Sequence, residues 1–290
     1  MITRARALAV LGSSALLTAC GGGARVRIGS KNFTESIVIA EIYAQALERA
    51  GIAVERRFNL GSTQIAMAAI ERGDIDCYPE YTGTALLDVL HLPPQRDPQA
   101  IYRAVAAAYA SRYRLVWLQP SPMNDSQGLV TTKAVAAAQH LATLSDAAKA
   151  APRLRLATIQ EFLVRADGLP GLQKAYGGFH FASVRTYDIA LKYRALLQGN
   201  ADVASAFTTD GAIESDELVV LRDDRHFWPA YNVAPVVRAS TLAARPAMRA
   251  ALDAIAPAIT DRAAQRMNAA VESGKMDPSD VAAAFLAEVR

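Results

Sequence analysis

Short apolar segments alternate with longer amphipathic segments along most of the chain. In the first part, residues 24–30, 52–60 and 74–79 have the alternation expected of β-strands. Amphipathic stretches follow each of them, and Gly51 and Gly73 stand where helices commonly end. This β-α-β-α-β order predicts a parallel sheet with right-handed helical crossovers.

The first strand is followed by a turn that predicts a helix start with a charged residue beside it. Asn32 and Glu35 have the spacing of a capping box, which predicts a helix that ends near Ala50. Lys31 precedes this helix start, where the helix dipole disfavours a cation. We interpret Lys31 as a partner, together with the helix end, of an anionic ligand. The alternative is a solvated surface lysine.

The pattern of strands and helices recurs after two proline-containing breaks. Strands are expected at residues 115–118, 128–132, 154–157, 202–207, 218–221 and 234–238, and helices at 98–111, 134–139, 144–150, 171–176, 188–197 and 246–290. Pro120 and Pro122 interrupt the pattern at residues 119–126, and residues 223–231 form a second loop. Two such crossings predict a hinged, two-lobed protein. We assign residues 25–122 and 233–290 to one lobe and residues 123–232 to the other.

Composition and charge narrow the class of protein. The 290 residues are 52% hydrophobic and 20% charged, which is typical of globular domains. The formal net charge is +3, and removal of residues 1–19, which carry Arg4 and Arg6, would lower it to +1. Such a small charge gives no reason to expect a nucleic-acid partner.

The N-terminal segment has the features of a leader peptide. Arg4 and Arg6 precede an apolar run at residues 7–17 that is too short to span a bilayer. The sequence Leu17-Thr18-Ala19-Cys20, followed by three glycines, resembles a bacterial lipobox. The resemblance implies a signal peptide at residues 1–19, a lipid on Cys20 and a tether at residues 20–24. The alternative is an ordinary secretory signal with an incidental cysteine.

The remaining cysteine, Cys77, has no second thiol with which to form an intramolecular disulfide after such cleavage. We expect Cys77 to pack as a small hydrophobic residue.

Residues 76–86 are unusually rich in functional groups for a core strand. They place Tyr81 and Thr84 three residues apart at a predicted strand-to-helix junction. A tyrosine ring face holds cations, and a threonine hydroxyl at a helix start holds anions. The junction therefore suits a zwitterion, although a buried tyrosine beside a helix cap gives the same pattern. Phe207, Thr208 and Thr209 repeat this arrangement at the end of a later strand.

The sequence gives little indication of catalysis or metal binding. It has no Walker A, G-x-S-x-G, H-E-x-x-H or C-x-x-C motif, and its four histidines lack the spacing of metal ligands. We expect no enzymatic activity, no cofactor and no metal. Several aromatic residues instead gather at strand ends and loops, as in a ligand box, with Tyr78 and Trp228 the weakest candidates; the set is Tyr78, Tyr81, Phe207, Phe227, Trp228 and Tyr231.

Five motifs together resemble the substrate-binding proteins of osmoprotectant ABC importers. They are Gly29-Ser30-Lys31-Asn32-Phe33-Thr34-Glu35, Glu80-Tyr81-Thr82-Gly83-Thr84-Ala85, Asp167-Gly168-Leu169-Pro170, Phe207-Thr208-Thr209-Asp210 and Trp228-Pro229-Ala230-Tyr231, and the resemblance covers residues 25–290. It implies a type II periplasmic-binding-protein fold: two lobes, each a mainly parallel sheet flanked by helices, with a ligand cleft between them. It also implies a monomeric, periplasmic, membrane-anchored lipoprotein that delivers glycine betaine, choline or a related quaternary ammonium compound to the membrane subunits of an ABC importer.

The same resemblance assigns roles to individual residues. Its carboxylate-holding positions correspond to Lys31, Thr84 and Arg165, and its aromatic-box positions correspond to Tyr81, Tyr231 and Phe207; Asp125 corresponds to a backbone carbonyl that faces the cation, and Gln127 stands where many members have a further box tyrosine. Phe207 replaces a frequent tyrosine and keeps the ring face. Gln127 removes one wall of the box, which predicts weaker binding of betaine.

Two other functions remain open from the sequence. A binding protein for another small zwitterion, such as an amino acid, needs an acceptor for the ammonium group, and Asp125 or Asp210 in the cleft would supply one. An enzyme or sensor with the same shell needs a nucleophile and a base within reach of each other.

Overall fold

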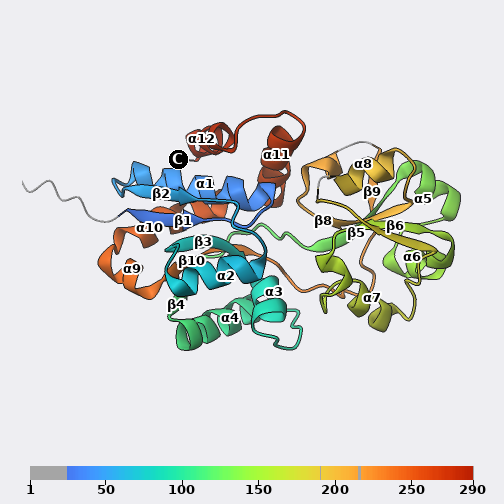
Figure 1. The fold of residues 1–290 in the computed structure, drawn as a ribbon, viewed down its shortest axis with the longest axis horizontal. Coiled ribbons are helices and arrows are strands. Elements are labelled where there is room, and N and C mark those ends of the chain that lie inside the picture. The colour runs from blue at the N-terminus through green and yellow to red at the C-terminus, as the bar shows by residue number, and fades with distance from the viewer. Residues whose placement is uncertain (1–24, 190, 215–216, 290) are drawn as a thin grey trace, which may run out of the picture.

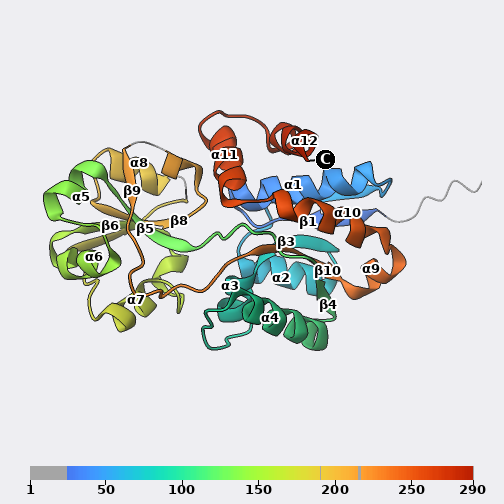
Figure 2. The same ribbon diagram turned by 180° about the vertical axis from the view of Figure 1, so that it is seen from behind.

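The structure, a computed structural model, describes residues 25–189, 191–214 and 217–289, and in these ranges the strands form two five-stranded sheets. One sheet has the order β2-β1-β3-β10-β4 and the other β7-β6-β8-β5-β9. Figures 1 and 2 show the two sheets in separate lobes, each flanked by helices. The leader expected at residues 1–19 and the lipidation site Cys20 lie outside the described residues.

The first lobe contains both ends of the described chain. Its strands are β1 (Val26–Gly29), β2 (Val54–Arg57), β3 (Cys77–Tyr81), β4 (Leu115–Trp117) and β10 (Val233–Arg238). Its helices are α1 (Thr34–Arg49), α2 (Thr63–Arg72), α3 (Thr82–Thr84), α4 (Pro98–Tyr113), α9 (Ala239–Ala244), α10 (Ala247–Ile255), α11 (Asp261–Glu272) and α12 (Pro278–Glu288), with the π-helical turn η1 (Ala85–Val89) directly after α3 and the 3-10 turn η5 (Ala256–Ala258) after α10.

The second lobe is built in the same way. Its strands are β5 (Gln127–Thr132), β6 (Arg155–Thr158), β7 (Ser183–Thr186), β8 (Val203–Phe207) and β9 (Leu218–Val220). Its helices are α5 (Lys133–Gln139), α6 (Leu144–Ala150), α7 (Leu169–Tyr176) and α8 (Leu191–Leu197), with 3-10 turns η2 (Ala151–Arg153), η3 (Glu161–Leu163) and η4 (Gly211–Glu214).

In each sheet, the antiparallel strand is the first strand after the chain crosses over from the other lobe. In the first lobe β1 runs parallel to β2 and β3, whereas β10 is antiparallel to β3 and β4. In the second lobe β6 runs parallel to β7 and β8, whereas β5 is antiparallel to β8 and β9. The expected α/β fold of two lobes with mainly parallel sheets is confirmed. The two crossings contact each other through a β-bridge between Asn124 and Asn232.

The capping box predicted at Asn32 and Glu35 is wrong. Helix α1 begins after Phe33, which makes no side-chain cap. The Glu35 carboxylate is turned into the protein instead, where it accepts hydrogen bonds from Tyr81 Oη at 2.8 Å and Asn268 Nδ2 at 3.1 Å. Two long-range partners thus replace one local contact.

One strand boundary differs from the sequence interpretation, and two elements were not predicted. The strand expected at residues 52–60 is limited to Val54–Arg57, and both β7 and α9 were missed. All four residues of β7 are exposed, so this edge strand carries no alternation of buried and exposed positions.

The interior of the first lobe surrounds β3. Cys77 is fully buried there, and burial raises the pKa of its thiol, so it packs as a small hydrophobic residue, as predicted. Among the described residues, none of the helices is long and apolar enough to cross a membrane.

Candidate functional site

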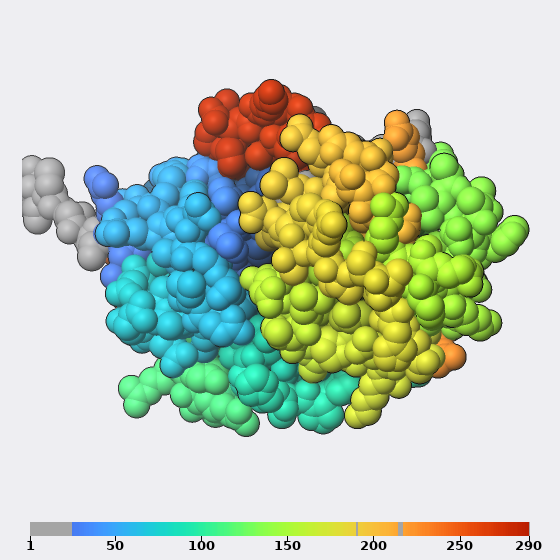
Figure 3. All heavy atoms as spheres, turned by 45° about the vertical axis from the view of Figure 1, so that its right-hand side comes forward, coloured from blue at the N-terminus to red at the C-terminus, as the bar shows by residue number. Residues whose placement is uncertain are grey.

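A cavity of about 350 Å³ lies between the lobes and contains every ligand-binding residue expected from the sequence. Figure 3 shows the lobes meeting across this region, with the N-terminal segments in blue on one side and the second lobe in yellow and green on the other. The expected residues all line the cavity: Lys31, Tyr81, Thr84, Asp125, Gln127, Arg165, Phe207 and Tyr231. Its volume falls in the range typical of small-molecule sites.

Strand ends and crossings deliver the aromatic side chains. Tyr81 is the last residue of β3, Phe207 is the last residue of β8, and Tyr231 lies on the second crossing. Phe33, which the sequence analysis did not select, joins them: its ring centroid lies 5.9 Å from that of Tyr81 and 6.4 Å from that of Phe207. Phe33 directly follows Lys31-Asn32 at a predicted helix start, and this position is the sequence feature that could have identified it as a cavity residue.

Hydroxyl contacts hold the two tyrosine rings in place. Tyr81 donates to Glu35 at 2.8 Å, and Tyr231 donates to Asp167 Oδ2 at 2.5 Å. Tyr231 also packs closely on Gly83, where a Cβ atom would lie 2.5 Å from the ring. The Thr82-Gly83-Thr84 motif therefore makes room for Tyr231, and both tyrosines line the cavity.

Lys31 is buried and already has a counter-charge. Its Nζ atom lies 2.6 Å from Glu80 Oε1 and 5.2 Å from the centroid of the Tyr81 ring. Glu80 also accepts hydrogen bonds from Tyr78 Oη and from the backbone N–H of Tyr81. The alternative of a solvated lysine is wrong, and an anionic ligand is not needed to explain the Lys31 charge.

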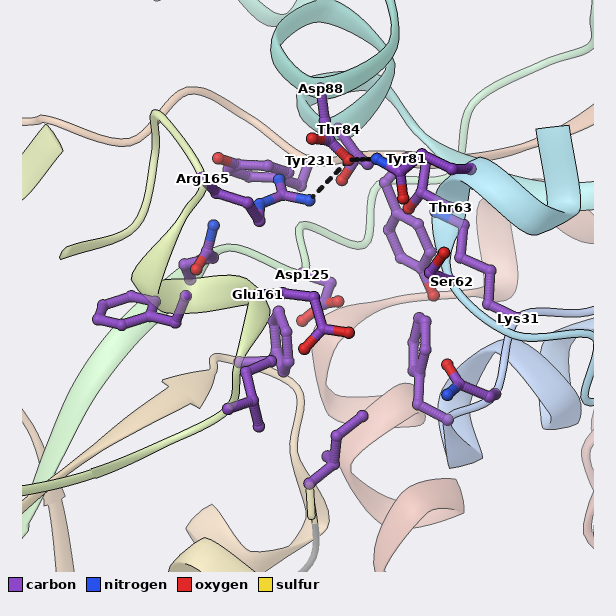
Figure 4. A pocket seen from close by; sticks show the side chains of 18 of the residues that line it. Lys31, Ser62, Thr63, Tyr81, Thr84, Asp88, Asp125, Glu161, Arg165 and Tyr231 are labelled. Atoms are coloured by element: carbon purple, nitrogen blue, oxygen red, sulfur yellow. Dashed lines mark hydrogen bonds and ion pairs between the residues drawn. The ribbon is translucent and has the colours of Figure 1, made fainter. Parts of the chain in front are cut away.

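Arg165 is likewise paired within the protein. Its Nε and Nη2 atoms donate to the two oxygens of Asp167 at 2.8 and 2.7 Å, and its Nη1 atom lies 3.3 Å from Asp88 Oδ2 across the cleft (Figure 4). Burial opposes ionisation of Asp167, but the hydrogen bonds and charge of Arg165, together with hydrogen bonds from Tyr231 and Gln127, lower the pKa of this carboxyl. The guanidinium therefore has carboxylate partners in both lobes.

Gln127 lies beside this network. It pairs with Phe207 in the β5–β8 ladder, and its side chain is buried at the cavity wall. A hydrogen bond from Gln127 helps to lower the pKa of Asp167. Trp228, a weak box candidate, donates its indole N–H to the Asp167 carbonyl at 2.8 Å and supports the same loop.

Two acidic residues lie at the junction of the lobes, Asp125 buried and Asp210 partly buried. Asp125 lines the cavity, and its carboxyl oxygen Oδ1 accepts a hydrogen bond from Thr209 at 2.7 Å. Burial and the nearby Glu35 raise the pKa of Asp125 well above its usual value. Asp210, the other acid considered from the sequence, is bound by Lys192, Tyr193 and the Phe207 backbone.

The Phe207 ring already contacts a cationic side chain of the protein itself. The Nζ atom of the fully buried Lys192 lies 5.1 Å from the Phe207 ring centroid and 3.1 Å from Asp210 Oδ2. This contact and the stacking on Phe33 orient the ring at the cavity wall.

Known proteins resemble this chain along nearly its whole length. A family model described as the substrate binding domain of ABC-type glycine betaine transport system matches residues 24–288. The glycine-betaine-binding protein of Pseudomonas aeruginosa is 34% identical over 274 residues, which cover 91% of this chain and 87% of that protein. The glycine betaine-binding protein YehZ of Escherichia coli is 31% identical, over 90% of this chain and 89% of that protein.

Solved structures give the same result. A glycine betaine/carnitine/choline ABC transporter protein matches with a TM-score of 0.77 and 30% identity, covering 91% of this chain and 98% of that one. Apo YehZ from Escherichia coli matches with a TM-score of 0.70 and 30% identity, covering 92% and 99% of the two chains.

Proposed function

The chain belongs to the family of substrate-binding domains of ABC-type glycine betaine transport systems, and from this premise we propose that its interlobe cavity captures a quaternary ammonium compound. The observation that carries this proposal is the convergence of aromatic rings, among them Phe33, Tyr81, Phe207 and Tyr231, on one cavity with the buried carboxyl of Asp125. The bound compound is delivered to the membrane subunits of an importer. The protein itself catalyses no reaction.

The aromatic wall matches the chemistry of the cation. A quaternary ammonium group has no N–H to donate, so ring faces and carboxyl or carbonyl oxygens are its natural partners. Each ring face contributes about 0.5–2 kcal/mol to the binding of a cation. Tyr81, Phe207, Tyr231 and Phe33 form the box in this proposal, and Asp125 places a buried carboxyl group beside it.

The remaining residues form the wall that receives the polar end of the ligand. Thr84, one turn into the helix after β3, and the two paired cations Lys31 and Arg165 line this side. Gln127 lines the cavity between Phe207 and the Arg165 network. Because its side chain has no ring, the aromatic box lacks a ring face on that side.

The position of the protein in the cell follows from its family and its leader. The family acts outside the cytoplasm, and we propose that cleavage before Cys20 and lipidation of its thiol tether a monomeric mature protein to the membrane. In this proposal the hinged lobes comprise residues 25–122 with 233–290, and residues 123–232.

Calorimetry and thermal shift with matched ligands test the proposal. Glycine betaine, choline, carnitine and proline betaine are compared with glycine and ethanolamine, which keep the polar ends and lack the methyl groups. A ligand that binds only the folded state at 100 times its Kd adds about 2.7 kcal/mol of stability. We expect this response for one or more methylated compounds and its loss in Tyr81→Ala. Binding of the unmethylated compounds alone would refute the proposal in favour of an amino-acid or amine carrier.

A further inference from the structure

Asp88 forms an ion pair with the Arg165 guanidinium, the group that a ligand carboxylate would need as its partner. Its Oδ2 atom lies 3.3 Å from Arg165 Nη1 and accepts a second hydrogen bond, at 2.9 Å, from Gln64 Nε2 of α2. The Asp88 and Arg165 side chains are 19% and 16% exposed, so this contact is only partly screened by solvent. Figure 4 shows the pair at the cavity beside Thr84 and Tyr231.

The local backbone brings Asp88 to this position. After α3 the chain makes one π-helical turn, Ala85–Val89, in which the N–H of Leu90 bonds to the carbonyl of Ala85. Such turns insert one residue into a helix and recur at functional sites. Thr84 and Asp88 both line the cavity as a result.

The charges around the cavity favour a cation over a carboxylate. Lys31 is paired with Glu80, and the Nε and Nη2 atoms of Arg165 are bound by Asp167. Asp88 takes the Nη1 side that remains. The cavity wall also carries the carboxyl group of Glu161. An incoming carboxylate would therefore have to displace Asp88 or lie beside it, and like charges in a partly desolvated site repel.

We propose that Asp88 is a specificity-determining residue, which competes with ligand carboxylates for Arg165 and makes the site select quaternary ammonium compounds that carry a neutral polar end. The inference rests on the proposed function and adds the charge class of the ligand. Asp88 acts in two ways: it occupies a charge-assisted donor, and its own charge attracts a cation in the cavity.

The test compares two ligands that share a trimethylammonium group. Choline ends in a hydroxyl and glycine betaine in a carboxylate, and calorimetry gives the Kd of each for the wild-type protein and for Asp88→Asn. We expect the wild type to bind choline more tightly. In Asp88→Asn the ratio of the two Kd values should shift at least tenfold toward glycine betaine, the effect of one charged hydrogen bond. Asp88→Ser is a second neutral variant if Asp88→Asn does not fold.

Glu161→Gln is the matched control, because it also removes one carboxylate from the cavity wall. Among the described residues, the Glu161 carboxylate forms no hydrogen bond or ion pair with the Arg165 guanidinium. The Arg165 backbone N–H donates to the Glu161 backbone carbonyl at 3.0 Å, a bond that Glu161→Gln leaves in place. A shift as large as that of Asp88→Asn would assign selectivity to overall charge and overturn the role of Asp88. An unchanged ratio in Asp88→Asn, with both ligands bound, would overturn this inference alone. Failure of the wild type to bind choline, glycine betaine, carnitine and proline betaine alike would refute the proposed function and this inference with it. Binding of carnitine or proline betaine, with neither choline nor glycine betaine bound, would overturn this inference alone.

Discussion

Replacement of Arg165 by alanine should destabilise the protein even when no ligand is present. The side chain is 16% exposed and its partner Asp167 is 3% exposed. Without the guanidinium, the Asp167 carboxylate keeps the hydroxyl of Tyr231 and the amide of Gln127 as side-chain partners that favour its charge. We expect Arg165→Ala to lower the free energy of unfolding by about 2–4 kcal/mol at pH 7.

Two limits set this magnitude. Breaking a buried ion pair costs about 3–5 kcal/mol when the remaining charge has no other partner, and the retained Tyr231 hydrogen bond reduces that figure. The upper limit is the free energy needed to protonate the Asp167 carboxylate once it has lost its guanidinium partner. For an aspartate with an ordinary pKa near 3.9, protonation at pH 7 costs about 4 kcal/mol.

The pH dependence gives the prediction a sign. In the wild type the pKa of Asp167 is lowered, so its contribution to stability is complete above the unfolded-state pKa and is lost only in more acid solution. In Arg165→Ala the folded-state pKa rises above the unfolded value, so stability falls as pH increases through it. The loss caused by the substitution should therefore be larger at pH 8 than at pH 5.

Urea unfolding at pH 5, 7 and 8 measures these differences, and Asp167→Asn completes a double-mutant cycle. Because the amide carries no charge to strand, Arg165→Ala should cost much less in the Asp167→Asn background. Arg155→Ala is the control, since Arg155 contacts Asp202 with the same two-pronged geometry, at 2.9 and 2.8 Å, on the surface. It should destabilise the protein far less.

The reasoning fails if Arg165→Ala unfolds at the wild-type urea concentration while ligand affinity drops. Arg165 would then act on the ligand and contribute nothing to the fold. A loss of stability that is independent of pH and additive with Asp167→Asn would equally contradict the stranded-charge explanation.

Three further predictions concern other parts of the chain. Gln127→Tyr should tighten glycine betaine binding by up to about 2 kcal/mol if the new ring reaches the cation; abolished binding of the native ligand in calorimetry, with betaine still unbound, would show that Gln127 contacts a more polar substrate. Cys20→Ser should release the protein from the membrane fraction, and a fully soluble wild type without lipid by mass spectrometry would contradict the anchor. Partial desolvation and the nearby Asp210 raise the pKa of Glu272 to about 7, so its contribution to stability should fall as pH rises from about 5 to 8. Because Glu272 is exposed and solvent screens its charge, Glu272→Gln should remove only about 1 kcal/mol of pH-dependent stability in thermal unfolding; an identical pH profile in the variant would exclude Glu272 as its source.

The sequence by itself determined the parts of this protein that depend on local pattern and on ordered motifs. Alternation and glycine stops located most strands and helices, and the strand order predicted parallel sheets whose carboxyl ends meet at one cleft. Tyr81 and Phe207 were found because each lies at the end of a strand, and Thr84 because it lies at the start of the helix that follows Tyr81. Local pattern was insufficient for the exposed edge strand β7, whose residues show no buried face.

Only the tertiary structure decided which charges in the cavity are free to bind a ligand. Lys31 meets Glu80 from a strand 49 residues away, and Arg165 meets Asp88 from the other lobe, 77 residues earlier in the chain. Phe33 joins the rings, and Glu35 leaves its expected cap, through contacts of the same kind. Residue types and spacing indicate which groups reach the cleft, but ion pairing falls off within a few ångströms, so it depends on the packing of distant segments against one another.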